Sequence, residues 1–287
     1  MRDFSRDHDA LSLNTATVRE QGDLVAIVEA CARHRIRTIA PWRDQVAAVG
    51  LARAVRAIRE AGLALSGYCR GGMFPADAAR QAAARDDNRR AVDEAAALGA
   101  PCLVLVVGGL PQFSRPGSAP SRDLGAARAQ VEDGIGALLD HAEPAGVALA
   151  IEPLHPMYAA DRSCVNTLAQ ALDLCDRLDP ACSGALGVAV DVYHVWWDPE
   201  LAAGIARAGR ERLLAYHVCD WLVPTRDLLL DRGMMGDGVV DLRAIRAAVE
   251  AAGYRGPAEV EIFSRDWWAR PLDEVLATCI ARHREVV

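Results

Sequence analysis

Four short apolar runs in the second half of the sequence each end in a side chain that binds metal ions. These runs are ALAIEPLH, ending at Glu152, GVAVDVYH at Asp191, LLAYHVCD at His217 and AEVEIF at Glu261. A buried parallel strand is normally apolar throughout, so a carboxylate or imidazole at its carboxyl end is costly unless something binds it there. We therefore predict one shared site, in which these four side chains hold a divalent metal.

The donor set narrows the choice of metal. Three carboxylates and one imidazole are mainly hard oxygen donors, which suit manganese, magnesium or cobalt better than they suit a thiolate zinc site. Zinc stays open as an alternative. A single glutamate or histidine at a strand end is more often a structural hydrogen-bonding group, but four suitable types on consecutive strands favour a metal. We expect one divalent ion, with Mn²⁺ as the first choice and Mg²⁺, Co²⁺ or Zn²⁺ as alternatives.

Alternating strand and helix patterns along the whole chain would position these residues. The expected strands cover residues 11–14, 38–41, 63–69, 102–107, 147–151, 187–192, 213–218 and 258–263. The helices expected after them cover residues 23–33, 46–61, 76–98, 121–145, 167–177, 199–208, 242–252 and 272–283, with Ser121 as the N-cap of the fourth. Eight such units without a break predict an α/β fold, a single (β/α)₈ barrel domain over residues 1–287. An open, doubly wound sheet is the main alternative.

The barrel supplies a geometry that the linear sequence lacks. Strands five to eight would be neighbours, so their carboxyl ends would meet at the mouth where barrel enzymes build their sites. Two long connections, residues 108–120 and 221–240, leave strands on the same side. We expect both to cover a substrate, and the alternative is that either contacts another copy of the chain in a homo-oligomer.

Composition excludes several classes of function. A formal charge of −7 disfavours binding to nucleic acid, and no apolar run approaches the roughly 20 residues of a membrane span. All 32 basic residues are arginine, which excludes a lysine Schiff base. The eight scattered cysteines form no CxxC pair and predict reduced thiols in a cytoplasmic protein. The polar start, MRDFSRDHDA, is expected to fray or to fold over the bottom of the barrel.

Several motifs together resemble those of the xylose isomerase-like barrels, a superfamily of sugar (phosphate) isomerases and epimerases. They are SGYCRGG (66–72), IEP (151–153), DVYH (191–194), HVCD (217–220) and VEIF (260–263). The resemblance covers essentially the whole chain and is specific for the superfamily, but not for a substrate. It implies that Glu152, Asp191, His217 and Glu261 are the metal ligands. It also implies that His194 contacts a substrate oxygen.

The resemblance also implies a reaction. In ketose epimerases and inosose isomerases of this group, two metal-bound glutamates face opposite sides of a substrate carbon, which makes Glu152 and Glu261 the acid/base pair here. We expect an isomerase or epimerase of a small ketose, inosose or related keto-polyol that transfers a proton through a metal-stabilised enediolate. Xylose isomerase itself uses a lysine for hydride shift, and this chain has none.

Other reactions and functions stay open at this stage. A lyase or dehydratase acting on a keto-sugar or a 3-keto-glycoside would use the same metal site. Another alternative is a barrel that binds a sugar and catalyses no reaction. A metal-dependent phosphodiesterase is disfavoured by the acidic balance of the chain and by the few histidines expected at the mouth.

Further residues near the strand ends are candidates for binding a small carbohydrate or cyclitol. His155 would either bond a sugar hydroxyl or cap a loop, and Asp220 would either meet substrate or join a loop contact. Arg232 would bind an anionic or hydroxyl-rich substrate if its loop folds inward, and would otherwise face solvent. The tryptophans after the strand ends would stack on the C–H face of a sugar or pack within loops; they are Trp196, Trp197, Trp221, Trp267 and Trp268.

Overall fold

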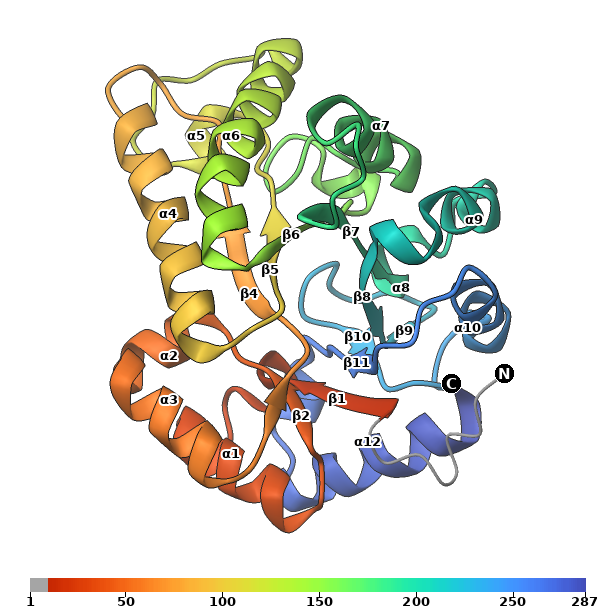
Figure 1. Cartoon of the computed structure of the whole chain (residues 1–287). Helices are drawn as coiled ribbons and strands as arrows, with labels where there is room; N and C mark the ends of the chain where they lie inside the picture. The colour runs from red at the N-terminus through yellow and green to blue at the C-terminus, as the bar shows by residue number, and fades with distance from the viewer. Residues whose placement is uncertain (1–9) are drawn as a thin grey trace.

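The apolar strands form one nine-stranded parallel sheet that closes almost completely into a barrel (Figure 1). The computed structural model describes residues 10–287, so nearly all of the polar start, including His8, lies outside the described residues. The order of strands in the sheet is β3-β2-β1-β11-β8-β7-β6-β5-β4. Their bounds are β1 (Leu11–Asn14), β2 (Thr38–Ala40), β3 (Ala64–Leu65), β4 (Tyr68–Gly72), β5 (Cys102–Val106), β6 (Ala148–Ile151), β7 (Leu186–Asp191), β8 (Leu213–Val218) and β11 (Ala258–Val260). The predicted barrel is therefore confirmed.

The third predicted strand is split into two pieces. β3 pairs with β2 and β4 pairs with β5, so the two ends of the sheet are consecutive in the chain. Ser66 and Gly67 separate the pieces, and the Ser66 hydroxyl turns toward the Glu259 carboxylate at 2.7 Å. The Cys69 N–H of β4 also bonds the Pro41 carbonyl just after β2 at 3.1 Å, so the chain and this contact together close the barrel.

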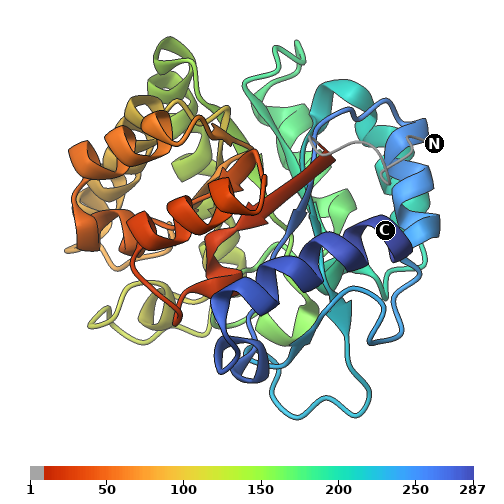
Figure 2. The same ribbon diagram turned by 90° about the horizontal axis from the view of Figure 1, so that it is seen from below.

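Helices form the outer ring around the strands, and α12 lies beside α1 where the ring closes (Figures 1 and 2). The long helices are α1 (Leu24–Arg33), α2 (Arg43–Val49), α3 (Leu51–Glu60), α4 (Gln81–Leu98), α6 (Leu124–Ala145), α7 (Leu168–Leu178), α9 (Leu201–Arg212), α10 (Leu242–Ala251) and α12 (Leu272–Val286). Short elements lie in the connections: η2 (Thr15–Val18), α5 (Pro111–Ser114), η3 (Pro156–Tyr158), α8 (Val192–Val195), β9 (Asp220–Trp221), β10 (Arg232–Gly233) and α11 (Arg265–Trp268).

Two predicted helices differ from those observed. The helix expected over 46–61 is two helices, because Gly50 between them has φ of 85°, outside the helical region. The helix expected from Ser121 begins at Leu124, and its N-cap is Asp123, whose side chain accepts the Ala126 N–H. A short carboxylate at this position satisfies a free N–H of the first turn, as the serine was expected to do.

Neither a membrane-spanning helix nor a disulfide occurs within residues 10–287. None of the helices within residues 10–287 has both the length and the hydropathy of a membrane span. All eight cysteines are unpaired, and every one except Cys182 is buried.

A buried ion pair ties two outer helices to the barrel and gives a test of the fold. Arg212, at the end of α9, donates to the Asp179 carboxylate at 2.7 Å and to the Leu186 carbonyl at 2.8 Å. Replacing Asp179 by alanine strands a buried guanidinium, so we expect a loss of about 3–5 kcal/mol in the free energy of unfolding. Urea denaturation measures this loss.

Asp173→Ala is the matched control for this experiment. Asp173 lies on α7, the helix that Asp179 caps, and its side chain is 54% exposed where it pairs with Arg207 at 2.8 Å. We expect its loss to cost less than about 1 kcal/mol, as for exposed ion pairs. Equal costs for the two variants would contradict the structural role given to the buried pair.

Candidate metal centre

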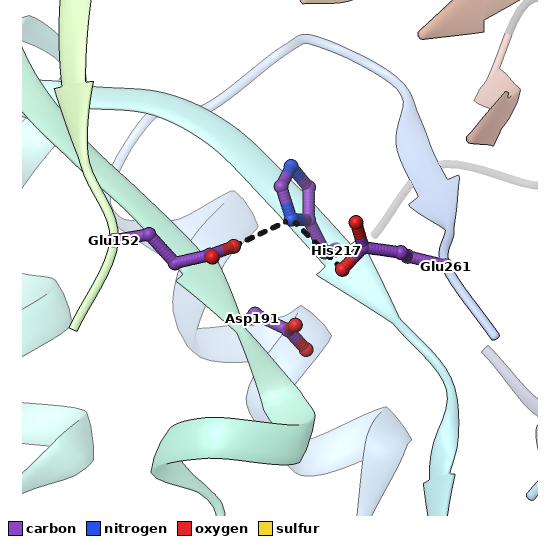
Figure 3. Close-up of side chains that lie close together, drawn as sticks. All are labelled: Glu152, Asp191, His217 and Glu261. Carbon is purple, nitrogen blue, oxygen red and sulfur yellow. Dashed lines mark hydrogen bonds and ion pairs between the residues drawn. The ribbon is translucent and has the colours of Figure 1, made fainter. Parts of the chain in front are cut away.

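The structure brings together the four strand-end side chains singled out by the sequence. Glu152 follows β6, Asp191 ends β7, His217 lies in β8 and Glu261 follows β11, and these strands are neighbours in the sheet. One potential ligand atom from each residue lies within 4.8 Å of the other three, and all four residues are buried. Glu152 and Glu261 reach His217 from opposite sides, with Asp191 beside them (Figure 3). The predicted convergence is present, and metal binding itself stays a prediction.

Hydrogen bonds hold the four side chains in this arrangement. His217 Nδ1 lies 3.1 Å from Glu152 Oε1 and 3.9 Å from Glu261 Oε2. The Arg232 guanidinium donates to Asp191 Oδ2 at 2.8 Å and to Glu261 Oε2 at 3.0 Å. Each of the four side chains therefore points a potential ligand atom into the same small volume between the strand ends.

The pKa values of the three carboxyl groups reflect the crowding of negative charge in the cluster. Burial raises the pKa of Glu261 to about 8, against the lowering effect of Arg232, and Glu152 adds to the rise. Burial likewise raises the pKa of Glu152. Burial also acts to raise the pKa of Asp191, but Arg232 and two histidines outweigh it and hold that pKa at about 2. A proton on a buried glutamate relieves the crowding of carboxylates.

A divalent cation would relieve the same crowding more completely. Hard oxygen donors with one imidazole form a suitable ligand set for manganese, magnesium or cobalt, and they also accept zinc. His217 presents Nδ1 to the cluster and not to a structural partner elsewhere. The residues present therefore fit one buried divalent ion.

Glu259 lies behind His217 and was not identified from the sequence. Its Oε1 lies 3.5 Å from His217 Nε2, a nitrogen that makes no hydrogen bond within residues 10–287. Asn14 and Ser66 bond the Glu259 carboxylate at 2.8 and 2.7 Å, and Asn14 also donates to Glu261 at 2.9 Å. The sequence held a signal for Glu259: it lies two residues before Glu261 in AEVEIF, and residues two apart in a strand point to the same face.

The loop that carries Arg232 folds inward. β10 pairs with β9, which sets Arg232 opposite Trp221, and the Arg232 guanidinium lies 4.5 Å from the Tyr193 ring centre and 5.2 Å from that of Phe263. Its Nη2 lies 3.1 Å from Nε2 of His194, a buried residue whose pKa burial lowers to about 3. Of the two alternatives for Arg232, the inward one is therefore the one observed.

A cavity of about 480 Å³ opens onto the cluster. Glu152, Glu261, His194 and Arg232 line it, and Leu229 and Leu230 come from the second long loop. That loop therefore forms part of the cavity wall, and its role in covering a substrate stays a prediction. The first long loop borders an adjoining hollow of about 280 Å³ through Ser114 and Arg115. The main cavity has the volume of a site for a small molecule.

His155 and Asp220 lie outside the lining of this cavity. The His155 ring stacks on Trp221 with 5.0 Å between ring centres, and its Nδ1 accepts the Met157 N–H. Asp220 accepts three backbone N–H groups, those of Trp221, Gly236 and Val240. Both side chains shape the loops at the mouth, and their contact with a substrate stays a prediction.

The aromatic residues at the cavity are mostly different from those expected. Trp42, Phe263 and Trp268 line it, whereas Trp221 stacks with His155 and packs against Tyr193. The sequence signal for Trp42 was its position directly after the second predicted strand, at the carboxyl end where a barrel places its site. Aromatic rings therefore line the cavity, and Trp268 is the predicted tryptophan among them; stacking on a sugar stays a prediction.

Comparison with known proteins gives a family match over most of the chain. The family described as xylose isomerase-like TIM barrel matches residues 20–282. The solved structure of protein SMc04130 from Sinorhizobium meliloti 1021 is 61% identical, with a TM-score of 0.92 over 98% of this chain and 99% of that one. The IolI protein with a zinc atom is 20% identical, with a TM-score of 0.80 over 97% and 98% of the two chains.

A curated relative adds a weaker, partial likeness. A 3-dehydroshikimate dehydratase from Pseudomonas aeruginosa is 34% identical over 111 residues. The matched part covers 37% of this chain and only 17% of the dehydratase. This likeness therefore concerns one segment of a much longer protein.

The position of Glu259 predicts an effect on metal affinity. A carboxylate behind a ligating histidine orients the ring and makes it more basic, so we expect Glu259→Gln to weaken Mn²⁺ binding about ten- to a hundredfold. Calorimetric titration with MnCl₂ measures this, and Glu143→Gln, an exposed change on α6, is the control. Unchanged affinity in Glu259→Gln would show that His217 does not depend on this contact.

The raised pKa of Glu261 predicts that metal binding releases protons. Below its pKa of about 8 this carboxyl carries a proton that a metal must displace. The apparent affinity for Mn²⁺ should therefore rise as the pH increases from 6 through 8. It should keep rising above that range, because the surrounding glutamates outweigh burial and raise the pKa of His217, which must also lose a proton. Titration in weakly buffered solution with a pH electrode should record protons released at pH 7; binding without release would count against Glu261 as a ligand.

Proposed function

Because the chain belongs to the xylose isomerase-like TIM barrel family, we propose that it is a divalent-metal-dependent isomerase or epimerase of a small ketose, inosose or related keto-polyol. The observation that carries this proposal is the pair of buried glutamates, Glu152 and Glu261. They follow the outer two of four neighbouring strands, with Asp191 and His217 between them. Two carboxylates can thus approach a bound molecule from two sides.

The metal would be held by Glu152, Asp191, His217 and Glu261. We propose Mn²⁺ as the ion, and the same donors would take Mg²⁺, Co²⁺ or Zn²⁺. When bound, a divalent cation polarises a carbonyl and stabilises the negative charge that develops on its oxygen.

The two glutamates would move the proton. Both lie in the buried cluster, and a carboxylate can accept a proton from a substrate carbon and return it. In an epimerase, one would remove the proton next to the carbonyl and the other would return it on the opposite face. In an isomerase, one carboxylate would carry it between adjacent carbons.

Arg232 would complete the site as a substrate-binding group, with His194 beside it. Its Nε is shielded from water and has no hydrogen-bond partner within residues 10–287, although its Nη1 atom is fully engaged. A substrate oxygen would satisfy this donor, and the positive charge would favour an oxyanion there. His194 would hold Arg232 in place, because its Nε2 lies 3.1 Å from Arg232 Nη2 and its Nδ1 accepts the His155 N–H at 3.3 Å; its contact with a substrate oxygen stays a prediction.

A dehydratase is the second candidate, and the partial likeness to 3-dehydroshikimate dehydratase favours it. The same pair of carboxyls would serve, because elimination of water needs a base for the C–H proton and an acid for the leaving hydroxyl. Product mass separates the candidates. Isomerisation leaves the mass unchanged, whereas dehydration removes one water.

Exchange with deuterated water tests the proposed reaction. The Mn²⁺-loaded protein should exchange the carbon-bound proton next to the carbonyl of at least one compound in a panel of ketoses and inososes. We expect Glu152→Gln and Glu261→Gln each to slow this exchange by about a hundred- to ten-thousand-fold, as for loss of an acid/base catalyst. Mass spectrometry follows both exchange and dehydration.

A surface variant is the control for the exchange experiment. Glu132→Gln, on the outer surface where Glu132 pairs with Arg177, should keep the full rate. Metal content is measured for each variant, so that a lost proton carrier is distinguished from a lost ion. Tight binding of a sugar with no exchange in the wild-type chain would instead indicate a barrel that binds without chemistry.

A further inference from the structure

Four carboxylates and four arginines line the cavity, but two of these arginines are not bonded by a carboxylate. Four arginines line it: Arg19, Arg70, Arg162 and Arg232. Two of them are already paired within the protein, since Arg19 bonds the Asp44 carboxylate and Arg232 bonds Asp191 and Glu261. The other two have positive charge left for something else.

Arg70 has no partner in the described part of the chain. It follows Cys69 in β4, so it lies toward the carboxyl end of a barrel strand, on the side of the site. Within residues 10–287 no ion pair or hydrogen bond reaches its guanidinium, although the residue is partly buried. It lines both the main cavity and the adjoining hollow, so its charge faces open space between them.

Arg162 is nearly as free. It follows β6 in the same loop region as Glu152, and its closest carboxylate, that of Asp161, is 3.9 Å away. Its Nε is shielded from water and unbonded within the described residues, and its guanidinium lies over the Tyr158 ring at 5.4 Å. An aromatic face orients a guanidinium but does not neutralise it.

The surroundings of Arg70 make its charge costly. Burial lowers the pKa of its guanidinium, and the nearby charges of Arg162 and Arg115 lower it further, while Asp44 acts weakly in the opposite direction. Asp44 is already bonded by Arg19, and Arg115 is already bonded to Asp87 at 3.1 Å. Like charges crowded beside a cavity are stabilised when an anion enters it.

We propose that Arg70 and Arg162 form an anion-binding subsite, which holds a carboxylate or phosphate group of the substrate while its carbonyl end lies at the cluster of Glu152 and Glu261. The inference rests on the proposed function, because it assigns a substrate class to that same cavity. A planar guanidinium fits a carboxylate or phosphate through two parallel N–H groups. Within the keto-polyols proposed above, the preferred substrate is therefore one that carries a carboxylate or phosphate group.

Three probes that share a ketohexose skeleton test this subsite. D-fructose is neutral, 5-keto-D-gluconate carries a carboxylate, and D-fructose 6-phosphate carries a phosphate. Calorimetric titration of the Mn²⁺-loaded full chain should show that at least one anionic probe binds about tenfold more tightly than fructose, as expected for an added charge-assisted pair. The probe that binds more tightly identifies carboxylate or phosphate as the preferred group.

Substitution then locates the effect. Arg70→Gln and Arg162→Gln should each abolish most of the preference for the anionic probe and leave the affinity for fructose unchanged. Arg70→Lys keeps the charge but loses the planar pair of donors, so it should retain an intermediate preference. Arg207→Gln removes one positive charge at the outer surface, where Arg207 pairs with Asp173 and Asp176, and should have no effect.

Several results would overturn the subsite. Equal affinity for neutral and anionic probes would do so, as would failure of both anionic probes to bind. An equal loss for all probes in Arg70→Gln, or an equal loss in Arg207→Gln, would show a structural or long-range effect instead. Repeating the titrations with a chelator separates the proposals: an anion preference that persists without metal supports the subsite even if no proton exchange is found.

Discussion

The site depends on the cost of placing several carboxylates in one dry volume. Glu152, Asp191 and Glu261 are buried at the ends of apolar strands, with little water to screen them. Their like charges repel, and burial adds to the penalty, so at least one of them keeps a proton until a cation takes its place. A folded protein can keep such a cluster only if positive charge or protons offset the repulsion between the carboxylates. This requirement links the architecture to the chemistry.

The barrel meets this requirement by supplying positive charge from parts of the chain that are distant in sequence. Arg232 reaches the cluster because the long loop after β8 turns back and pairs β10 with β9. His217 arrives by strand register, opposite Asp191 on one side and Glu259 on the other. The result is a cluster in which one guanidinium and one imidazole lie against three buried carboxylates. In the anion-binding subsite proposed above, Arg70 and Arg162 would be compensated in a similar way, by an acidic group of the substrate.

The sequence predicted those features that follow from local pattern. Apolar runs that end in Glu152, Asp191, His217 and Glu261 identified the strands, their common edge and the fold, because parallel strands must end together. It did not predict the split of the third strand, where Ser66 bonds the Glu259 carboxylate across the barrel. Whether Arg232 faces inward depends on loop pairing. The contacts of Asp220 depend on the N–H groups of Gly236 and Val240, which the following loop brings back to it. Such contacts join residues that no local spacing relates.

One measurement tests the central claim most directly: the position of the metal in crystals of the protein grown with Mn²⁺, located by its anomalous scattering. The account predicts a single strong peak per chain, within bonding distance of oxygen atoms from Glu152, Asp191 and Glu261 and of Nδ1 of His217. A peak elsewhere, or none at the cluster at saturating Mn²⁺, would show that these four side chains do not form a metal centre.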